Sequence, residues 1–277
     1  MSETILETSG IVCSFGELRA VDDVSIRVET GSAVAVVGPN GSGKSTLLNV
    51  ISGFVAPGAG TVTVAGKRLD GAKPWRIARH GVRRTFQQAN LPARMTVVEL
   101  LVASATLPVD SAVLRSAFAH RTVLSERRAA VDKARTILDW LELPATADLC
   151  AGELSGGQQK LVGLGAALMG DPRLLLLDEP MAGVNPALRA KLAVRLRELQ
   201  ADGMTILLVE HDMKFVASAC DRVYVLDRGA VVAHSSPRDL AANEAVRRAY
   251  LGTASTDLES PADSTAGDLE RKGANAT

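Results

Sequence analysis

The chain has 277 residues, enough for one large domain or two small ones. Its 31 basic and 31 acidic residues give a net charge of +0, so there is no basic field to attract nucleic acid and we expect no nucleic-acid partner. The N-terminal residues do not form a signal peptide, and no apolar run reaches the ~20 residues that span a bilayer, so membrane work would need a spanning partner.

Residues from about 5 to 54 alternate short apolar runs with turn residues and lead into a glycine-rich loop. Ala33–Val37 is a short run of apolar, partly β-branched residues and predicts a buried parallel strand. The pattern G-x-x-x-x-G-K-[ST] follows at once, and Thr46–Ile51 predicts the next helix, which Gly53 can stop. A chance match of a Gly/Ser-rich turn is disfavoured, because strand and helix both stand in place.

This loop predicts a nucleoside triphosphate site. Its glycines allow backbone N–H groups to turn inward around phosphates at the start of a helix. Lys44 is expected to reach the β- and γ-phosphates, and Ser45 to place its hydroxyl on Mg²⁺. The residues predicted to bind ATP here are Gly38, Pro39, Asn40, Gly41, Ser42, Gly43, Lys44, Ser45 and Thr46.

The middle of the chain changes character and predicts helices from about 96 to 143. Val131, Ala134, Leu138 and Leu141 fall on one face at helical spacing, and we assign that stripe to the core.

A second loop that can face phosphates starts at residue 154. In the sequence Leu-Ser-Gly-Gly-Gln, Ser155 and Gln158 fit a capping box, so Ser155, Gly156 and Gly157 lie at a helix N-terminus. One chain thus carries two triphosphate-facing loops but only one lysine-bearing loop. A head-to-tail dimer, with each ATP between the two kinds of loop, resolves this mismatch.

The run Leu175-Leu176-Leu177 predicts a buried strand that ends in two carboxylates. Asp178 at the strand tip is placed to hold Mg²⁺, and Glu179 is placed to polarise the attacking water. The alternative, an exposed acidic turn before Pro180, becomes less favoured once the phosphate loop upstream is considered.

The last part of the chain alternates helices and strands again. Asn185 and Pro186 predict a helix start, and Arg222–Leu226 with Ala230–His234 predicts a hairpin. Residues 253–277 are polar and lack aromatic side chains, so we predict a disordered tail.

These motifs together resemble the ABC ATPase family over about residues 5–252. Leu154–Gln158 looks like the family signature, and the resemblance makes Asp178 the magnesium carboxylate and Glu179 the catalytic one. It implies an α/β fold: a P-loop NTPase core with a mixed sheet, an antiparallel β subdomain and an inserted α-helical subdomain. The core would take residues 5–95 and 150–252, and the helical subdomain about 96–149.

The same resemblance assigns further site residues. Gln87 looks like the glutamine that contacts the metal and senses the γ-phosphate, and His211 like the switch histidine at a strand end. Phe15 resembles the aromatic residue that stacks on adenine, while core packing is an equal alternative for it. Asn185 departs from the Asp that more often ends the loop across the dimer axis.

At a finer level the chain is similar to the larger ATPase of branched-chain amino acid importers, or of urea and short-amide importers. The resemblance implies three kinds of partner: a second ATPase subunit (self or paralogue), multi-span permeases, and a solute-binding protein that is linked indirectly. It also implies a location on the cytoplasmic face of the inner membrane. Phe86, Leu91, Met95 and Val97 are candidates to contact a permease helix, with core packing as the alternative. An ABC exporter subunit and a soluble ABC ATPase remain as other functions.

Overall fold

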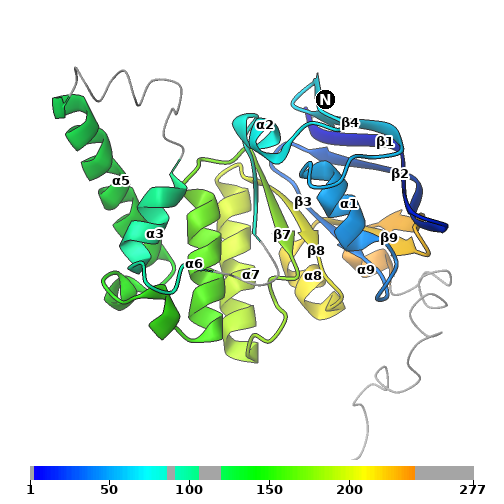
Figure 1. The fold of residues 1–277 in the computed structure, drawn as a ribbon. Coiled ribbons are helices and arrows are strands. Elements are labelled where there is room, and N and C mark those ends of the chain that lie inside the picture. The colour runs from blue at the N-terminus through cyan, green and yellow to red at the C-terminus, as the bar shows by residue number, and fades with distance from the viewer. Residues whose placement is uncertain (1–2, 86–90, 106–119, 241–277) are drawn as a thin grey trace, which may run out of the picture.

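A computed structural model describes residues 3–85, 91–105 and 120–240 of the chain. The strands form a 4-stranded and a 6-stranded sheet, which face each other on one side of the molecule (Figure 1). The first sheet is antiparallel, in the order β2 (Leu18–Glu29), β1 (Thr4–Phe15), β4 (Ala59–Val64), β5 (Lys67–Arg68). The second is mixed, in the order β10 (Ala230–Ser235), β9 (Arg222–Asp227), β3 (Ala33–Val37), β8 (Thr205–Val209), β7 (Leu174–Asp178), β6 (Val82–Arg84).

The central strands of the mixed sheet are buried on both faces. Every residue of β3, β7 and β8 is buried, which explains why these strands are continuous apolar runs. Because side chains alternate along a strand, Ala33, Ala35 and Val37 pack into one hydrophobic core while Val34 and Val36 pack into another. The sheet therefore separates two cores.

Helices cover the two faces of this sheet differently (Figure 1). The helix α1 (Lys44–Ile51) packs into the core shared with the antiparallel sheet, through side chains such as Leu47, Leu48 and Ile51. The helices of the other core are α3 (Val97–Ser104), α5 (His120–Trp140), α6 (Gly156–Leu168), α7 (Pro186–Ala201), α8 (Met213–Ala219) and α9 (Pro237–Leu240). Short helices complete the fold: α2 (Pro74–Arg79), η1 (Pro144–Thr146) and η2 (Ala151–Glu153).

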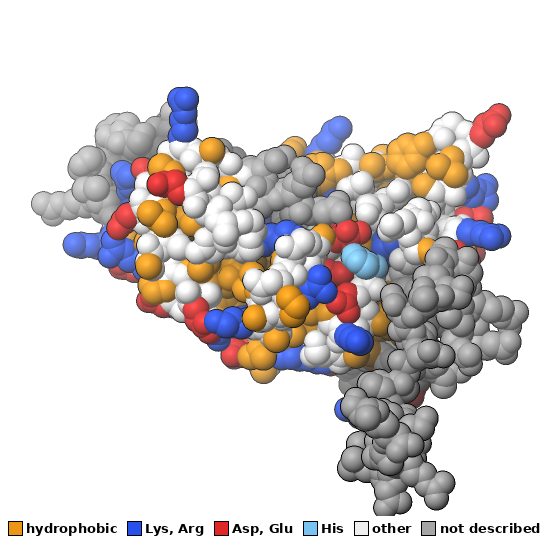
Figure 2. All heavy atoms as spheres, turned by 90° about the horizontal axis from the view of Figure 1, so that it is seen from below, with side chains coloured by type: hydrophobic (Ala, Val, Ile, Leu, Met, Phe, Trp, Pro, Cys, Tyr) orange, Lys and Arg blue, Asp and Glu red, His pale blue; other side chains and the backbone are white. Residues whose placement is uncertain are grey.

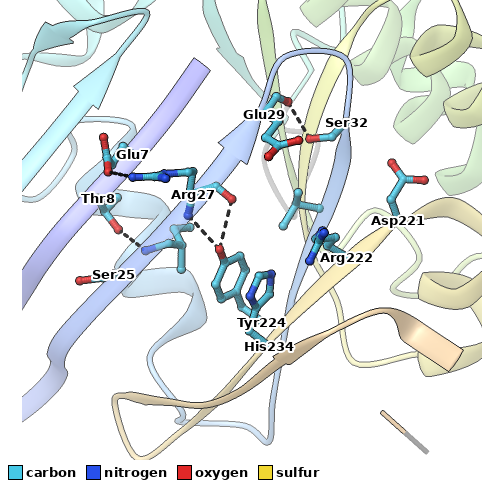
Figure 3. A pocket seen from close by; sticks show the side chains of 12 residues that line it. Glu7, Thr8, Ser25, Arg27, Glu29, Ser32, Asp221, Arg222, Tyr224 and His234 are labelled. Atoms are coloured by element: carbon cyan, nitrogen blue, oxygen red, sulfur yellow. Dashed lines mark hydrogen bonds and ion pairs between the residues drawn. The ribbon is translucent and has the colours of Figure 1, made fainter. Parts of the chain in front are cut away.

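A tyrosine joins the two sheets beside an open pocket of about 600 Å³ (Figure 3). The Tyr224 hydroxyl accepts a hydrogen bond from the Arg27 N–H at 3.0 Å and donates one to the Arg27 carbonyl at 3.2 Å. The Tyr224 ring stacks on His234, with centroids 4.0 Å apart. Burial, and then the nearby Arg222, lower the pKa of His234. This contact fixes β2 against β9.

The structure confirms the predicted fold class and most of the predicted elements. The Asn185 side chain accepts a hydrogen bond from the Leu188 N–H at 2.9 Å and caps α7, as predicted. The helix after the phosphate loop begins at Lys44 rather than at the predicted Thr46, because Gly43 turns the chain directly into it at φ 100°. No helix among the described residues is long and apolar enough to cross a membrane. The predicted disorder of 253–277 lies outside the described residues.

Candidate active site

The predicted site residues follow neighbouring strands. β3, β8 and β7 are adjacent and parallel, so their carboxyl ends share one edge of the sheet. The Glu179 N–H donates to the Val209 carbonyl at 3.0 Å, and the Glu210 N–H donates to the Val36 carbonyl at 3.2 Å. This edge therefore brings together the loop after β3, the Asp178–Glu179 turn and the start of the His211 loop.

The phosphate loop is shaped by glycines that its surroundings require. A Cβ at Gly43 would lie 2.3 Å from the Ala20 carbonyl oxygen, and the φ of 100° is left-handed. A Cβ at Gly38 would lie 2.1 Å from the Leu226 carbonyl oxygen. The loop thus packs directly against the backbone of neighbouring segments, and its glycine-rich conformation fits the binding of nucleotide phosphates by backbone N–H groups.

Lys44 is 5% exposed and lies inside this loop. Its ammonium group donates to the carbonyls of Gly38 at 2.8 Å and Pro39 at 2.9 Å. Burial lowers the pKa of Lys44, and the carboxylates of Glu179, Asp178 and Glu210 only partly oppose this effect. The lysine is therefore a costly buried cation, which a bound phosphate would stabilise.

Asp178 ends β7 and has one engaged and one unengaged oxygen. Its Oδ2 pairs with Arg84 at 2.7 Å, while Oδ1 is buried without a hydrogen-bond partner among the described residues. The Ser42 hydroxyl is in the same condition, and Ser45 is exposed at the start of α1. A carboxylate oxygen and a hydroxyl are suitable donors to Mg²⁺, so these residues fit that ion.

The loop that follows Glu179 and the loop of His211 are joined by Glu210, which was not among the predicted site residues. Glu210 is fully buried, and its side chain accepts hydrogen bonds from the N–H groups of Met181 at 2.9 Å and His211 at 3.1 Å. Glu179 has a left-handed backbone at φ 43°, a strained conformation that is often found at functional sites. The His211 side chain is 57% exposed, with Nδ1 3.7 Å from Glu210 Oε2. An acidic residue that continues a fully buried strand was the available signal for Glu210.

The second glycine-bearing loop forms the predicted capping box. The Gln158 N–H donates to Ser155 Oγ at 3.3 Å, and the Ser155 N–H donates to Gln158 Oε1 at 2.9 Å. Ser155, Gly157 and Gln158 line a cavity of about 300 Å³ together with Gly183 and Asn185. Lys160 was not predicted as a site residue, but it donates to the Ala182 carbonyl and links α6 to the loop after Glu179.

The remaining site predictions have different outcomes. Phe15 is 53% exposed at the end of β1, so the core-packing alternative is wrong for it, and stacking on adenine stays a prediction. Gln87 and Phe86 lie outside the described residues. Val97 is fully buried in the helical core, so its proposed contact with a permease is wrong, because its side chain is already packed inside.

Fold and site together define a nucleoside triphosphatase of the P-loop class. A strand, a glycine-rich loop with a lysine, and a helix are followed by two carboxylates on a neighbouring parallel strand. On the described part of the face in Figure 2, acidic and basic side chains are interspersed rather than separated.

Comparison with known proteins identifies the family. The profile of the ABC transporter family matches residues 21–182, and the chain belongs to this family as an ATP-hydrolysing subunit. The branched-chain amino acid transport ATP-binding protein BraF of Pseudomonas aeruginosa is 38% identical over 92% of this chain and 100% of its own length. The probable branched-chain amino acid transport ATP-binding protein LivG of Methanocaldococcus jannaschii is 42% identical over 83% of this chain and 88% of its own length.

Solved structures agree with this assignment. The ADP conformation of an ATP-binding cassette of an ABC transporter superposes with a TM-score of 0.77 at 36% identity, covering 91% of this chain and 100% of the other. A nucleotide-free cassette gives the same TM-score at 36% identity and covers 89% and 98%.

Proposed function

We propose that this protein energises import of branched-chain amino acids. The proposal is supported by relatives whose names state that transport and which match along almost their whole length. The urea, amide and exporter alternatives have no comparable support among the relatives reported above. The observation that carries the catalytic part is the meeting of Lys44, Asp178, Glu179 and His211 at one sheet edge.

The residues have distinct roles in this proposal. Lys44 contacts the β- and γ-phosphates, and the N–H groups of the loop and of α1 surround them. Asp178 and Ser45 hold Mg²⁺, which supplies positive charge to the phosphates when bound. Glu179 orients and polarises the attacking water, and His211 contacts the γ-phosphate from the neighbouring strand end. Gln87 is proposed to sense the same phosphate, and Phe15 to stack on adenine.

The working unit is proposed to be a head-to-tail dimer of ATPase subunits, either two copies or a copy and a paralogue. The Ser155-Gly156-Gly157 end of α6 would close over the nucleotide held by the other subunit, because a helix N-terminus favours anions. Multi-span permeases would anchor the dimer at the cytoplasmic face of the inner membrane, and a solute-binding protein would act through them. We take residues 96–149 as the helical subdomain in this arrangement.

The catalytic assignment is tested with Glu179→Gln. Removal of the base should lower ATP turnover roughly 100-fold or more while ATP binding persists, so that an ATP-bound dimer accumulates. Turnover is measured by phosphate release and dimerisation by size-exclusion chromatography with light scattering. Glu7→Gln is the matched control, since Glu7 is a half-exposed carboxylate paired with Arg27 on the antiparallel sheet. Turnover of Glu179→Gln near the wild-type value would refute the assignment of the base.

The transport assignment needs a different measurement. The complex is isolated from gently solubilised membranes, reconstituted in liposomes, and assayed for ATP-dependent uptake of labelled leucine, with labelled urea as the comparison. Uptake of leucine that needs a solute-binding protein supports the proposal. Uptake of urea alone, or membrane partners without any binding protein, would replace it with the corresponding alternative.

A further inference from the structure

Arg84 lies next to the proposed magnesium carboxylate. It ends β6, whose parallel pairing with β7 sets Arg84 opposite Leu176, two residues before Asp178. Because side chains on the same face of a sheet recur every two residues, Arg84 reaches along the strand to Asp178. The Nη2–Oδ2 distance is 2.7 Å, and both side chains are 8% exposed.

The same guanidinium group is held from a second side. Its Nη1 donates to Asn49 Oδ1 and to Ser52 Oγ, both at 2.7 Å and both from the α1 region that follows the phosphate loop. The guanidinium carbon also lies 5.6 Å from the centre of the Phe54 ring. A planar fork with fixed donors is suited to such simultaneous contacts, and a flexible lysine is not. Arg84 therefore joins α1, β6 and β7 at the site.

This arrangement has an electrostatic consequence. Arg84 places a positive charge directly beside the buried side chain of Asp178, and removing one partner of such a buried pair leaves the other without compensation. The other oxygen of Asp178 is buried and has no hydrogen-bond partner among the described residues. Once Mg²⁺ binds, two cations share one carboxylate and repel each other.

We propose that Arg84 is the resident counter-ion of Asp178. It balances the charge of the buried carboxylate while Mg²⁺ is absent, and it competes with Mg²⁺ for that charge, so that the metal is held less tightly. Arg84 is thus a positioning residue. The inference rests on the role proposed above for Asp178.

The test compares Arg84→Met with the wild type. Binding of a fluorescent ADP analogue is followed as Mg²⁺ is added to EDTA-treated protein, and the melting temperature is measured with and without Mg²⁺ and ADP. We expect the half-saturating Mg²⁺ concentration to fall at least threefold. The nucleotide-free variant should melt lower than wild type, and Mg²⁺ with ADP should narrow that gap. Arg84→Lys restores the cation and should return the Mg²⁺ requirement toward the wild-type value.

Arg83→Met is the matched control. Arg83 is also partly buried, but its Nη1 donates to the backbone carbonyls of Ala78 at 2.6 Å and Val82 at 3.1 Å. Its loss should lower the melting temperature without moving the Mg²⁺ titration. An unchanged Mg²⁺ requirement in Arg84→Met would overturn the proposal, because it would show that Arg84 acts only on stability. A higher Mg²⁺ requirement would also overturn it, because it would show that Arg84 helps the metal to bind rather than competing with it.

Asp178→Asn separates the two levels of the argument. If this variant keeps the wild-type Mg²⁺ dependence, the role proposed for Asp178 fails. If it loses the dependence while Arg84→Met does not shift it, only the counter-ion inference fails. Should Arg84→Met not fold, the double variant with Asp178→Asn decides: recovery of folding supports the pairing, and continued failure to fold overturns it.

Discussion

Gly43 of the phosphate loop and Gly156 at the start of α6 differ in what requires a glycine. At the phosphate loop, a Cβ on Gly43 would lie 2.3 Å from the Ala20 carbonyl oxygen, and the backbone is left-handed. At the start of α6, Gly156 has helical backbone, and a Cβ there would find no atom within 4 Å. Gly43 is explained by the fold of its own subunit, whereas Gly156 is not.

This difference indicates which of the two loops makes its decisive contacts outside its own subunit. A glycine that neither conformation nor packing requires suggests close approach by something outside the subunit. In the head-to-tail dimer proposed above, that something is the nucleotide held by the other subunit. Substitutions at the two loops should therefore separate subunit stability from activity.

The largest effect on stability is expected for Gly43→Ala. The new Cβ meets backbone, which cannot move as a side-chain end can, and the left-handed conformation adds strain. We expect a loss of about 3 kcal/mol in the free energy of unfolding and loss of nucleotide binding. Urea denaturation and binding of a fluorescent ATP analogue measure the two. Stability near the wild-type value would mean that the loop tolerates a side chain and that the contrast with Gly156 is false.

A smaller loss of stability is expected for Ser155→Ala. The variant removes the hydroxyl that accepts the Gln158 N–H, which should cost about 1 kcal/mol. Ser155→Asn is the informative control, because asparagine caps helices as well as serine does. We expect Ser155→Asn to restore the stability but not the ATP-dependent dimer, as measured by light scattering. Full restoration of dimerisation by asparagine would show that Ser155 acts only as a cap.

Local patterns in the sequence predicted much of this site. The strand at 33–37, the phosphate loop, the capping box at Ser155 and the Asn185 cap each depend on residues within a few positions of one another. Such patterns act through backbone hydrogen bonds and side-chain alternation, so they are visible before any tertiary contact is known.

The contacts that were missed depend on pairing between distant strands. Arg84 meets Asp178 across 94 positions because β6 lies beside β7 in a defined register. Glu210 holds the N–H of Met181 because β8 and β7 end at the same level of the sheet. The sequence shows these charged residues, but their partners follow only from strand order.

The change in stability caused by Lys44→Met should be smaller than that caused by Ser155→Ala, and it should depend on pH. Burial lowers the pKa of Lys44 below its usual 10.5, so between these two values the unfolded chain binds more protons than the folded one. The stability of the wild type therefore rises with pH through this window, and below it the buried charge costs stability. Lys44→Met removes that cost and should unfold at an equal or slightly higher urea concentration at pH 7.5, without binding nucleotide.

The difference between these two proteins is the measurement that checks the pH effect. It should shrink as the pH is raised toward 10.5, since the wild-type lysine then loses its charge in both states. A Lys44→Met protein that is clearly less stable than wild type at pH 7.5 would contradict the expectation. In that case the hydrogen bonds to Gly38 and Pro39 would outweigh the cost of burial.

The smallest effect on stability is expected for Gly156→Ala, within about 0.5 kcal/mol, because alanine suits a helix and finds open space here. The isolated subunit should also bind the fluorescent ATP analogue as wild type does, since its own phosphate loop is unchanged. Dimerisation should nevertheless be lost and turnover should fall at least roughly tenfold, because a methyl group would stand where the other subunit's phosphates approach.

The four measurements on Gly156→Ala, of stability, ATP binding, dimerisation and turnover, are informative only together. Retained stability and retained ATP binding exclude damage to the subunit, so a loss of turnover would have to arise between subunits. A dimer that forms and hydrolyses ATP normally would show that nothing approaches Gly156 closely, and the two loops would then act separately. The contrast between Gly43 and Gly156 thus distinguishes a glycine required by the fold of one subunit from a glycine required by contact between subunits.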